Sequence, residues 1–316
     1  MIQISPETQL FIREHSSDDV RVLALQAKKY PDIDMPTAIT QIAGRKVAAE
    51  KIPSWWEIEK IWYPKHLSLE QCSSEITARY KARLLQGDSL TDLTGGFGID
   101  CSFLATGFKS ATYVERQEEL CEIAAHNFPI LNLNHINVKN EDGVSYLQAM
   151  SPVDCIFLDP ARRNEHGGKT VAISDCEPDV AELEELLLNK AGQVMVKLSP
   201  MLDLSLALKE LQHVQKVHII SANNECKELL LILGQASVEE ISIHCVNLPT
   251  KGIQEEQHFV FTREQEQCSE CNYTNALENY LYEPNASLLK AGAFRSIASA
   301  FPVKKLHPNS HLYTSD

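Results

Sequence analysis

Short apolar runs alternate with segments of helical periodicity through the middle of the chain. The runs predict β-strands at residues 89–93, 110–115, 134–139, 153–158, 193–198 and 213–221. Apolar residues at helical spacing lie between them, at 99–106, 117–132, 143–150, 178–189 and 205–211. Strands that alternate with helices indicate βαβ units and a mostly parallel sheet, which strands at 229–233 and 239–246 would close.

The N-terminal part has a different pattern. Helical spacing covers residues 20–29 and 37–51, and prolines stand at the expected helix boundaries. The aromatic segment 54–63 predicts a helix whose rings pack on the next domain, rather than a platform for stacked bases.

After residue 262 the apolar pattern weakens. Residues 263–279 are polar and predict a linker or an exposed hairpin, whereas 286–301 predict one helix. We therefore expect three parts, namely a helical N-terminal region (1–75), an α/β domain (76–262) and a small C-terminal segment (263–316).

The composition excludes several classes of protein. With 316 residues, 44% of them hydrophobic and 23% charged, the chain is neither disordered nor collagen-like and can bury a core. The longest aliphatic run, 229–233, is too short to span a bilayer, and residues 1–20 lack a signal-peptide pattern. The sequence therefore predicts a cytoplasmic protein with no membrane contact.

Nine cysteines lie mostly in apolar stretches, as the reduced thiols of a cytoplasmic protein do. Only Cys268 and Cys271 form a CxxC pair, and no second pair completes a zinc site. We expect no bound metal.

The net charge of −14 argues against a basic nucleic-acid clamp, because affinity for phosphate backbones comes largely from Lys and Arg. The charge is unevenly distributed. Eleven of the 14 excess negative charges fall in residues 81–240, whereas residues 281–316 have a balance of +2. A nucleic-acid contact would depend on this basic tail, on Arg162 and Arg163, and on any further C-terminal module.

A glycine-rich loop, Asp92-Leu-Thr-Gly-Gly-Phe-Gly-Ile-Asp100, follows the first predicted strand and opens a helix. Its glycines let the backbone approach a ligand closely, and the helix start offers N–H groups. Glu115 ends the next strand, 20 residues after Gly95, where an acid can accept the ribose hydroxyl hydrogens of a nucleoside.

Two further acids follow the next strands. Asp142 comes just after the third predicted strand, and Asp159 directly follows the fourth. Open α/β sheets bind ligands at the carboxyl ends of their strands, so we expect these acids to join Asp92 and Glu115 in one ligand site.

This arrangement resembles the class I S-adenosylmethionine-dependent methyltransferases over residues 70–235. The resemblance implies an α/β fold with a Rossmann-like, doubly wound sheet, and S-adenosyl-L-methionine as cofactor. It implies that Glu115, with Arg116 beside it, binds the ribose and that Asp142 meets the adenine amine. It also implies that the loop holds the methionine end through Asp92, Thr94, Gly95, Gly96, Gly98 and Asp100.

A nicotinamide dehydrogenase is the competing interpretation of the loop. Its fingerprint G-x-G-x-x-G is not met, because Cys101 stands at the third glycine position after Gly96 and Gly98. The acid before the glycines, Asp92, is also typical of methyltransferases rather than of dehydrogenases.

Thr94 replaces the first glycine of the common methyltransferase loop, and the resulting D-x-T-x-G-x-G-x-D form is similar to that of some ribosomal RNA guanine-N2 methyltransferases. The upstream segment 71–81 resembles one that in this group lies over the methionine end, which implies cofactor contacts for Ser73, Ser74 and Glu75. The same serines also fit a helix N-cap, and both interpretations stay open.

Asp159-Pro-Ala-Arg-Arg163 stands where amino-methyltransferases of nucleic acids carry D/N-P-P-Y/F. In that motif the polar side chain and a proline-held carbonyl grip the exocyclic amine, and the aromatic ring stacks on the base. Asp159 and Pro160 keep the pattern, whereas Ala161 and Arg162 replace the proline and the aromatic residue. An arginine can stack on a base or pair with a phosphate, so catalytic-site roles for Arg162 and Arg163 compete with those of a surface pair.

Lys197 and Ser199, at the end of the fifth predicted strand, reach the same edge of the sheet and could bind the substrate. Lys197 could meet a substrate phosphate, and a plain strand-end charge is the alternative. No cysteine stands beside the Asp159 loop, since Cys155 lies inside the strand, so attack on a pyrimidine ring by a thiol is not expected.

The Asp-Pro-Ala-Arg-Arg motif and the closing segments 282–286 and 306–313 resemble a bacterial family assigned as methyltransferases. In that family a ferredoxin-like segment and a THUMP-like, RNA-associated domain follow the catalytic domain. The resemblance implies that this sequence stops where the THUMP-like unit would begin, as a truncated chain would.

The sequence therefore predicts a methyltransferase that acts on tRNA or rRNA, at an exocyclic base amine. Two alternatives stay open. A small-molecule or protein methyltransferase fits the negative charge and the missing aromatic residue, and a catalytically silent module could use the same fold to recognise RNA or a protein.

Overall fold

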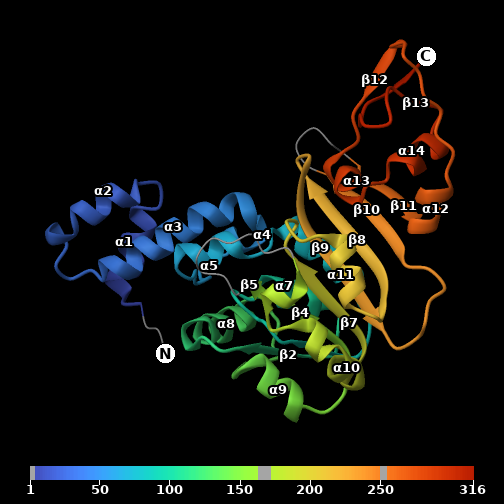
Figure 1. The fold of residues 1–316 in the computed structure, drawn as a ribbon. Coiled ribbons are helices and arrows are strands. Elements are labelled where there is room, and N and C mark those ends of the chain that lie inside the picture. Colours follow the sequence, from blue (N-terminus) through green and yellow to red (C-terminus); the bar gives the residue numbers. More distant parts are fainter. Residues whose placement is uncertain (1–3, 163–171, 250–254) are drawn as a thin grey trace. The chain divides into compact units, whose positions relative to one another are not determined.

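The computed structural model describes residues 4–162, 172–249 and 255–316 (Figure 1). The chain divides into two compact units, Met1–Ile156 and Phe157–Asp316. The three-part division expected from the sequence stays a prediction.

The first unit begins with helices, coloured blue in Figure 1. They are α1 (Pro6–Glu14), α2 (Val20–Leu25), α3 (Met35–Lys51), α4 (Pro53–Trp56), α5 (His66–Gln71) and α6 (Glu75–Ala82), with a 3-10 turn at Ala27–Lys29. Side chains of Ser5, Asp19 and Asp34 accept backbone N–H groups at the starts of α1, α2 and α3. The apolar faces of these three helices meet in one cluster of Phe11, Leu23, Met35, Ala38 and Ile42.

The α/β part of the first unit contains short strands and the helices that connect them. The elements are β1 (Ser89–Asp92), α7 (Ile99–Leu104), a 3-10 turn at Ala105–Gly107, β2 (Ser110–Glu115), α8 (Glu118–Ile130), β3 (Ile136–Asn140), α9 (Gly143–Ala149) and β4 (Val153–Leu158). β1 pairs with β2 and β2 with β3, both in parallel, which puts their carboxyl ends at one edge.

The second unit contains the remaining elements. After β5 (Ala161–Arg162) they are a 3-10 turn at Ile173–Asp175, β6 (Cys176–Glu177), α10 (Val180–Lys190), β7 (Ala191–Leu198), α11 (Leu204–Glu210), β8 (Val214–Ala222), β9 (Glu225–Gly234), β10 (Ser242–Leu248) and β11 (Gln257–Thr262). The C-terminal segment adds α12 (Arg263–Cys268), β12 (Tyr280–Tyr282), α13 (Ala286–Ala291), α14 (Phe294–Ala300), β13 (Lys304–Lys305) and β14 (Tyr313–Ser315).

The main sheet has the strand order β11-β10-β8-β9-β7-β4-β1-β2-β3. β9 lies antiparallel between β7 and β8, as in the class I methyltransferase sheet, and β10 and β11 extend that sheet. The predicted fold class is therefore confirmed. Asn223 and Asn224, both at φ 54°, make the tight turn that reverses the chain from β8 into β9.

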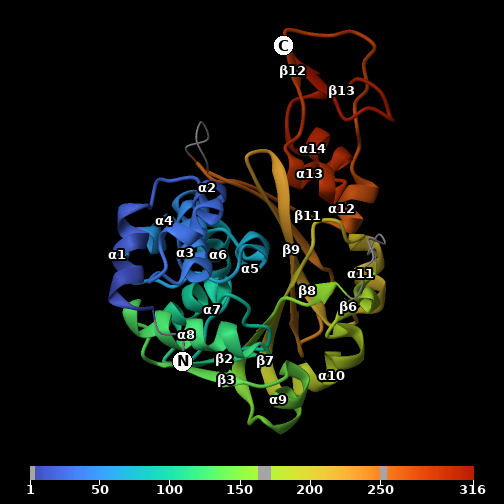
Figure 2. The ribbon, with the colours of Figure 1, turned by 90° about the vertical axis from the view of Figure 1, so that its left-hand side faces the viewer.

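Two expectations for the C-terminal segment are wrong. The periodicity of residues 286–301 predicted one helix, but Gly292 at φ +72° ends α13, and α14 begins at Phe294. The polar pattern of residues 263–279 predicted a linker or an exposed hairpin, but Arg263–Cys268 form α12, which begins with a capping box of Thr262 and Gln265. Figure 2 shows these three helices beside the small sheet of order β12-β14-β13.

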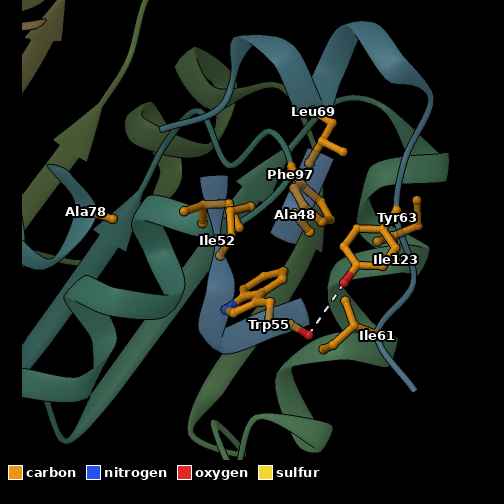
Figure 3. Packing of buried hydrophobic residues seen from close by; sticks show 10 residues of the cluster. Ala48, Ile52, Trp55, Ile61, Tyr63, Leu69, Ala78, Phe97 and Ile123 are labelled. Carbon is orange, nitrogen blue, oxygen red and sulfur yellow. Dashed lines mark hydrogen bonds between the residues drawn. The ribbon is translucent and has the colours of Figure 1, made fainter. Parts of the chain in front are cut away.

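The rings of the aromatic segment after α3 pack into the core, as predicted, but the predicted helix over 54–63 is wrong, because α4 ends at Trp56 (Figure 3). Trp55 is 2% exposed and meets the ring of Phe97, from the glycine-rich loop, edge-on at 5.2 Å. Tyr63 joins the same cluster and donates its hydroxyl to the carbonyl of Trp55 at 3.5 Å. The neighbouring Trp56 is 42% exposed and stays outside the cluster.

Three histidines lie in a row across β8, β10 and β11. The ring of His218 stacks on His244 at 4.4 Å, and Nδ1 of His244 is 3.1 Å from Nε2 of His258. Burial, with the nearby charges of His244, His258 and Lys216, lowers the pKa of His218 to about 3. Burial, with His258 and Lys216, lowers the pKa of His244 to about 4. The buried ring of His218 and the half-buried ring of His244 are therefore neutral at physiological pH.

This predicts a pH-dependent stability. The unfolded chain takes up protons on these histidines below about pH 6.5, whereas the folded chain does not until about pH 3 to 4, so stability falls as the pH drops through this window. Between pH 6.5 and 4, the free energy of unfolding of His218→Phe should change less steeply with pH than that of the wild type. The slope should be smaller by up to about 1.4 kcal/mol per pH unit. Urea unfolding at several pH values measures this, and equal slopes in the two proteins would contradict it.

Candidate functional site

The glycine-rich loop lies directly against β2. The N–H of Gly95 donates to the carbonyl of Val114 at 2.8 Å. A Cβ at Gly95 would stand 2.2 Å from the ring of Tyr113, so only glycine fits between loop and strand. Gly96 and Gly98 have φ values of 53° and 85°, a backbone conformation that favours glycine.

Glu115 holds the loop from the end of β2. One carboxylate oxygen, Oε2, accepts the N–H of Gly96 at 2.9 Å, and Oε1 accepts the N–H of Gln117 at 2.9 Å. Tyr113 donates its hydroxyl to the carbonyl of Gly96. Burial, followed by the charge of Glu115, raises the pKa of Tyr113 well above its ordinary value, so the hydroxyl stays a donor. Each oxygen of Glu115 keeps a further lone pair for a ligand hydroxyl.

Asp92 acts on the loop's own backbone. The residue is 1% exposed, and its Oδ1 accepts the N–H of Thr94 at 3.0 Å. The interaction fixes the turn in which the chain leaves β1. A direct contact of Asp92 or Thr94 with a cofactor stays a prediction.

Asp100, at the start of α7, belongs to a buried polar cluster. Its Oδ2 accepts the hydroxyl of Ser73 at 2.7 Å, and its Oδ1 lies 3.1 Å from Nζ of Lys81. Lys81 also donates to Ser73 at 3.0 Å, and its side chain is fully buried. The cluster ties the segment before α6 to the first turn of α7.

Of the two interpretations left open for Ser73 and Ser74, the N-cap fits the position of Ser74 but not its hydroxyl. Ser74 occupies the N-cap position, but it bonds the hydroxyl of Thr77 at 3.3 Å instead of a backbone amide. Glu75 accepts the N–H of Ser54 at 2.8 Å and pairs with Arg79 at 2.7 Å. Burial raises the pKa of Glu75, but these bonds outweigh it and leave the pKa below its ordinary value.

Asp142 and Arg116 are exposed at the ends of β3 and β2. Oδ1 of Asp142 caps α9 by accepting the N–H groups of Val144 and Ser145, at 3.1 and 3.0 Å. The carbonyl of Arg116 accepts the amide of Asn140 at 3.1 Å. Ligand contacts of these two residues stay predictions.

In the second unit, Asp159 and Lys197 form an ion pair. Nζ of Lys197 lies 2.5 Å from Oδ2 of Asp159, and the lysine side chain is 11% exposed against 36% for the aspartate. Pro160 is buried beside them in the chain. The hydroxyl of Ser199 accepts the N–H of Met201 at 3.3 Å.

The two arginines of the motif, Arg162 and Arg163, directly follow Ala161 in the chain. Ala161 and Arg162 form β5, which pairs antiparallel with β6, so the backbone directly after Asp159 is held in a ladder. The described residues include only the backbone of Arg162, and Arg163 lies outside them. Their predicted catalytic roles stay predictions.

Sequence reasoning missed three residues that shape this site. Tyr113 lies within the predicted strand 110–115 and Lys81 within the segment 71–81, and neither was assigned a role. Asn140 bonds the carbonyl of Glu115 at 3.0 Å and so braces the end of β2 from β3. The only available signal was position, since Tyr113 and Asn140 stand within two residues of acids that were singled out.

Within the described ranges, no group of three or more His, Cys, Asp or Glu side chains is arranged to hold a metal ion. Cys268 is exposed and Cys271 is partly buried. No helix among those same ranges has the length and apolar character needed to cross a membrane.

The loop and its acids suit a nucleoside-containing cofactor. A Cβ at Gly96 would meet only the carbonyl of Thr94, at 3.8 Å, so open space lies beside this backbone where a ligand can approach. The carboxylate of Glu115 can accept ligand hydroxyls next to that space, because it already accepts the N–H of Gly96.

The chain is similar to a solved protein along its whole length. It is 35% identical to a "putative methyltransferase" from Porphyromonas gingivalis W83, with a TM-score of 0.86 over 100% of this chain and 80% of that one. A family model described as a ferredoxin-like domain matches residues 280–316. No curated protein matches the chain in sequence.

More distant solved structures share less. An rRNA methylase from Streptococcus thermophilus is 14% identical, with a TM-score of 0.38 over 51% of this chain and 96% of that one. SMU.1697c from Streptococcus mutans, solved in complex with SAH, is 14% identical with a TM-score of 0.37 over the same shares.

The packing of the loop predicts a strong effect of one methyl group. Gly95→Ala should lower the free energy of unfolding by about 1–3 kcal/mol, because the Cβ forces the ring of Tyr113 to move. Gly107→Ala is the matched control, since no atom lies within 4 Å of its Cβ, and it should change stability by less than about 0.5 kcal/mol. Urea unfolding of both variants checks this, and equal effects would contradict it.

Proposed function

The chain belongs to the same family of class I methyltransferases as the Porphyromonas gingivalis protein, and on that premise we propose that it transfers a methyl group from S-adenosylmethionine to RNA. The acceptor is an exocyclic amine of a tRNA or rRNA base. The observation that carries the cofactor half is the bond between Glu115 and the N–H of Gly96, which puts a carboxylate beside a loop open to a ligand.

Three residues of the first unit would hold the cofactor. Glu115 accepts hydrogen bonds from the ribose hydroxyls, the backbone at Gly96 borders the methionine part, and Asp142 meets the adenine amine. Asp92, Asp100 and the Ser73–Lys81 pair act indirectly, because their bonds go to the loop and to the start of α7. When bound, the cofactor supplies an electrophilic methyl group.

Asp159 is the group that handles the acceptor amine. Its carboxylate is 36% exposed, so it can accept an N–H of the amine and take up the proton as the methyl group is transferred. Lys197 fixes the orientation of this carboxylate through Oδ2. We therefore assign Lys197 to positioning Asp159, in place of the substrate-phosphate contact expected from the sequence.

The RNA substrate is supported by the Asp-Pro motif after β4 rather than by charge. The basic residues of the tail bond within the protein: Lys290 donates to the carbonyl of Leu202, Arg295 to that of Gln267, and Lys304 pairs with Glu278. These contacts weaken the expectation that the basic tail binds RNA phosphates. A small-molecule methyltransferase is therefore the second candidate.

Cofactor binding is tested by calorimetry with S-adenosylmethionine. Glu115→Gln should weaken binding by about 10- to 100-fold, because hydrogen bonds to a charged group are lost. Glu118→Gln, three residues further on and exposed, is the control and should bind as the wild type does. No binding to the wild type at millimolar cofactor would overturn the proposal.

The role of Lys197 is tested by methyl transfer to RNA from cells that lack the protein. Lys197→Met should lower kcat about 100-fold and change its pH profile, because Asp159 loses its orientation. Lys197→Arg should recover part of the rate, and Lys209→Met, an exposed lysine of α11, should not change it. A salt-dependent rise in KM with kcat unchanged would instead identify Lys197 as a phosphate contact.

A further inference from the structure

A cavity of about 540 Å³ lies within the second unit, against β10 and β11. Its lining comes mainly from the C-terminal segment and includes Phe259, Tyr282, Phe301 and Tyr313, with Gln257 and Glu283 as polar members. The volume is within the range of pockets that bind small organic groups. None of the residues assigned to the methyl-transfer site lines it.

Two of the four aromatic residues of this cavity, Phe301 and Tyr282, are open to solvent, whereas Tyr313 is buried. Phe259 and Phe301 face each other at 6.1 Å and 34°. Phe301 is 52% exposed and Tyr282 is 43% exposed. Large apolar rings that a protein leaves this exposed around one hollow are typical of a binding surface.

The row of rings continues along β12. Tyr280 and Tyr282 are two residues apart, so they lie on the same face of the strand, with ring centroids 6.3 Å apart. Tyr280 is 60% exposed. The cavity therefore opens onto a second stacking surface, as a ligand made of successive flat units would require.

The polar groups of the cavity match the edge of a base. Oε1 of Gln257 accepts the amides of Asn247 and Asn285, at 3.0 and 3.2 Å, which leaves Nε2 as the donor end of this side chain. Glu283 supplies an exposed acceptor. A donor and an acceptor beside aromatic faces fit a nucleobase, which carries both on its edge.

We propose that the cavity takes one unpaired base of the RNA substrate and that Tyr280 stacks on the adjacent base. The proposal rests on the RNA substrate proposed above. A double helix does not fit, because its bases are already stacked and paired. A phosphate does not fit either, since Glu283 repels it and the nearby Lys305 is buried, with its Nζ bonded to the carbonyls of His307 and Pro308.

Binding of single-stranded octamers of A, C and U to the full chain tests this, measured by fluorescence anisotropy of labelled RNA. Tyr282→Leu and Phe301→Leu keep apolar volume but lose the ring, and each should weaken binding of the preferred octamer about tenfold. Tyr282→Phe keeps the ring and should bind within about twofold of the wild type. Leu281→Ala is the matched control, because Leu281 is 55% exposed on the opposite face of β12.

Each outcome of this binding experiment either supports or overturns the proposal. The proposal is supported if the Leu variants, with unchanged melting temperatures, bind octamers more weakly while Leu281→Ala does not. It is overturned if no octamer binds the wild type at millimolar concentration, if a duplex octamer binds as well as a single strand, or if the Leu variants bind like the wild type. Methyl transfer by the wild type to bulk RNA is measured in parallel. This assay shows whether the proposed RNA methyltransferase activity is wrong or only the proposed role of the cavity.

Discussion

The attachment of the glycine-rich loop to β2 is the constraint on which the first unit depends. Gly95 bonds the strand backbone, Gly96 bonds Glu115, and Tyr113 bonds the loop in return. The position of the loop fixes Phe97, which is 3% exposed and packs edge-on against Trp55. One short segment therefore presents backbone to a ligand on one side and anchors the N-terminal helices on the other. A change in the loop should therefore affect both the stability of the unit and the proposed binding of the cofactor.

The central α/β elements could be predicted because their apolar runs and helical spacing are locally determined, and the loop could be identified because glycines, an acid and a strand end occur together. Contacts between distant residues could not be predicted. Lys81 has the sequence context of a solvent-facing lysine, and only the folded chain brings it to Asp100 and Ser73. The break at Gly292 was missed because a glycine inside a periodic stretch is often tolerated in a helix, whereas here it adopts φ +72° and ends α13.

The acidic middle of the chain has a structural explanation. Many of its carboxylates accept backbone N–H groups where strands and helices begin. Glu184 accepts the amides of Gln212 and His213, and Asp179 and Asp203 cap α10 and α11. Hydrogen bonds from the amides of Asp88 and Ser89 lower the pKa of Asp154, so folding favours its charged form. The net charge of −14 thus reflects how the chain satisfies its backbone, and it says less about the substrate than its magnitude suggests.

The distance between Asp159 and the aromatic cavity offers a reason why the Asp-Pro motif lacks its aromatic residue. Asp159 follows β4, and the aromatic cavity borders β10, with β7, β9 and β8 between these strands in the sheet order. Four strand spacings amount to about 19 Å, so the base proposed to enter the cavity would differ from the base whose amine is proposed to meet Asp159. Under this proposal, the protein stacks on one nucleotide of the strand and methylates another. On this view, Tyr282 and Phe301 fix the position of the RNA along the protein, and the Asp159–Lys197 pair acts on the nucleotide that this position presents.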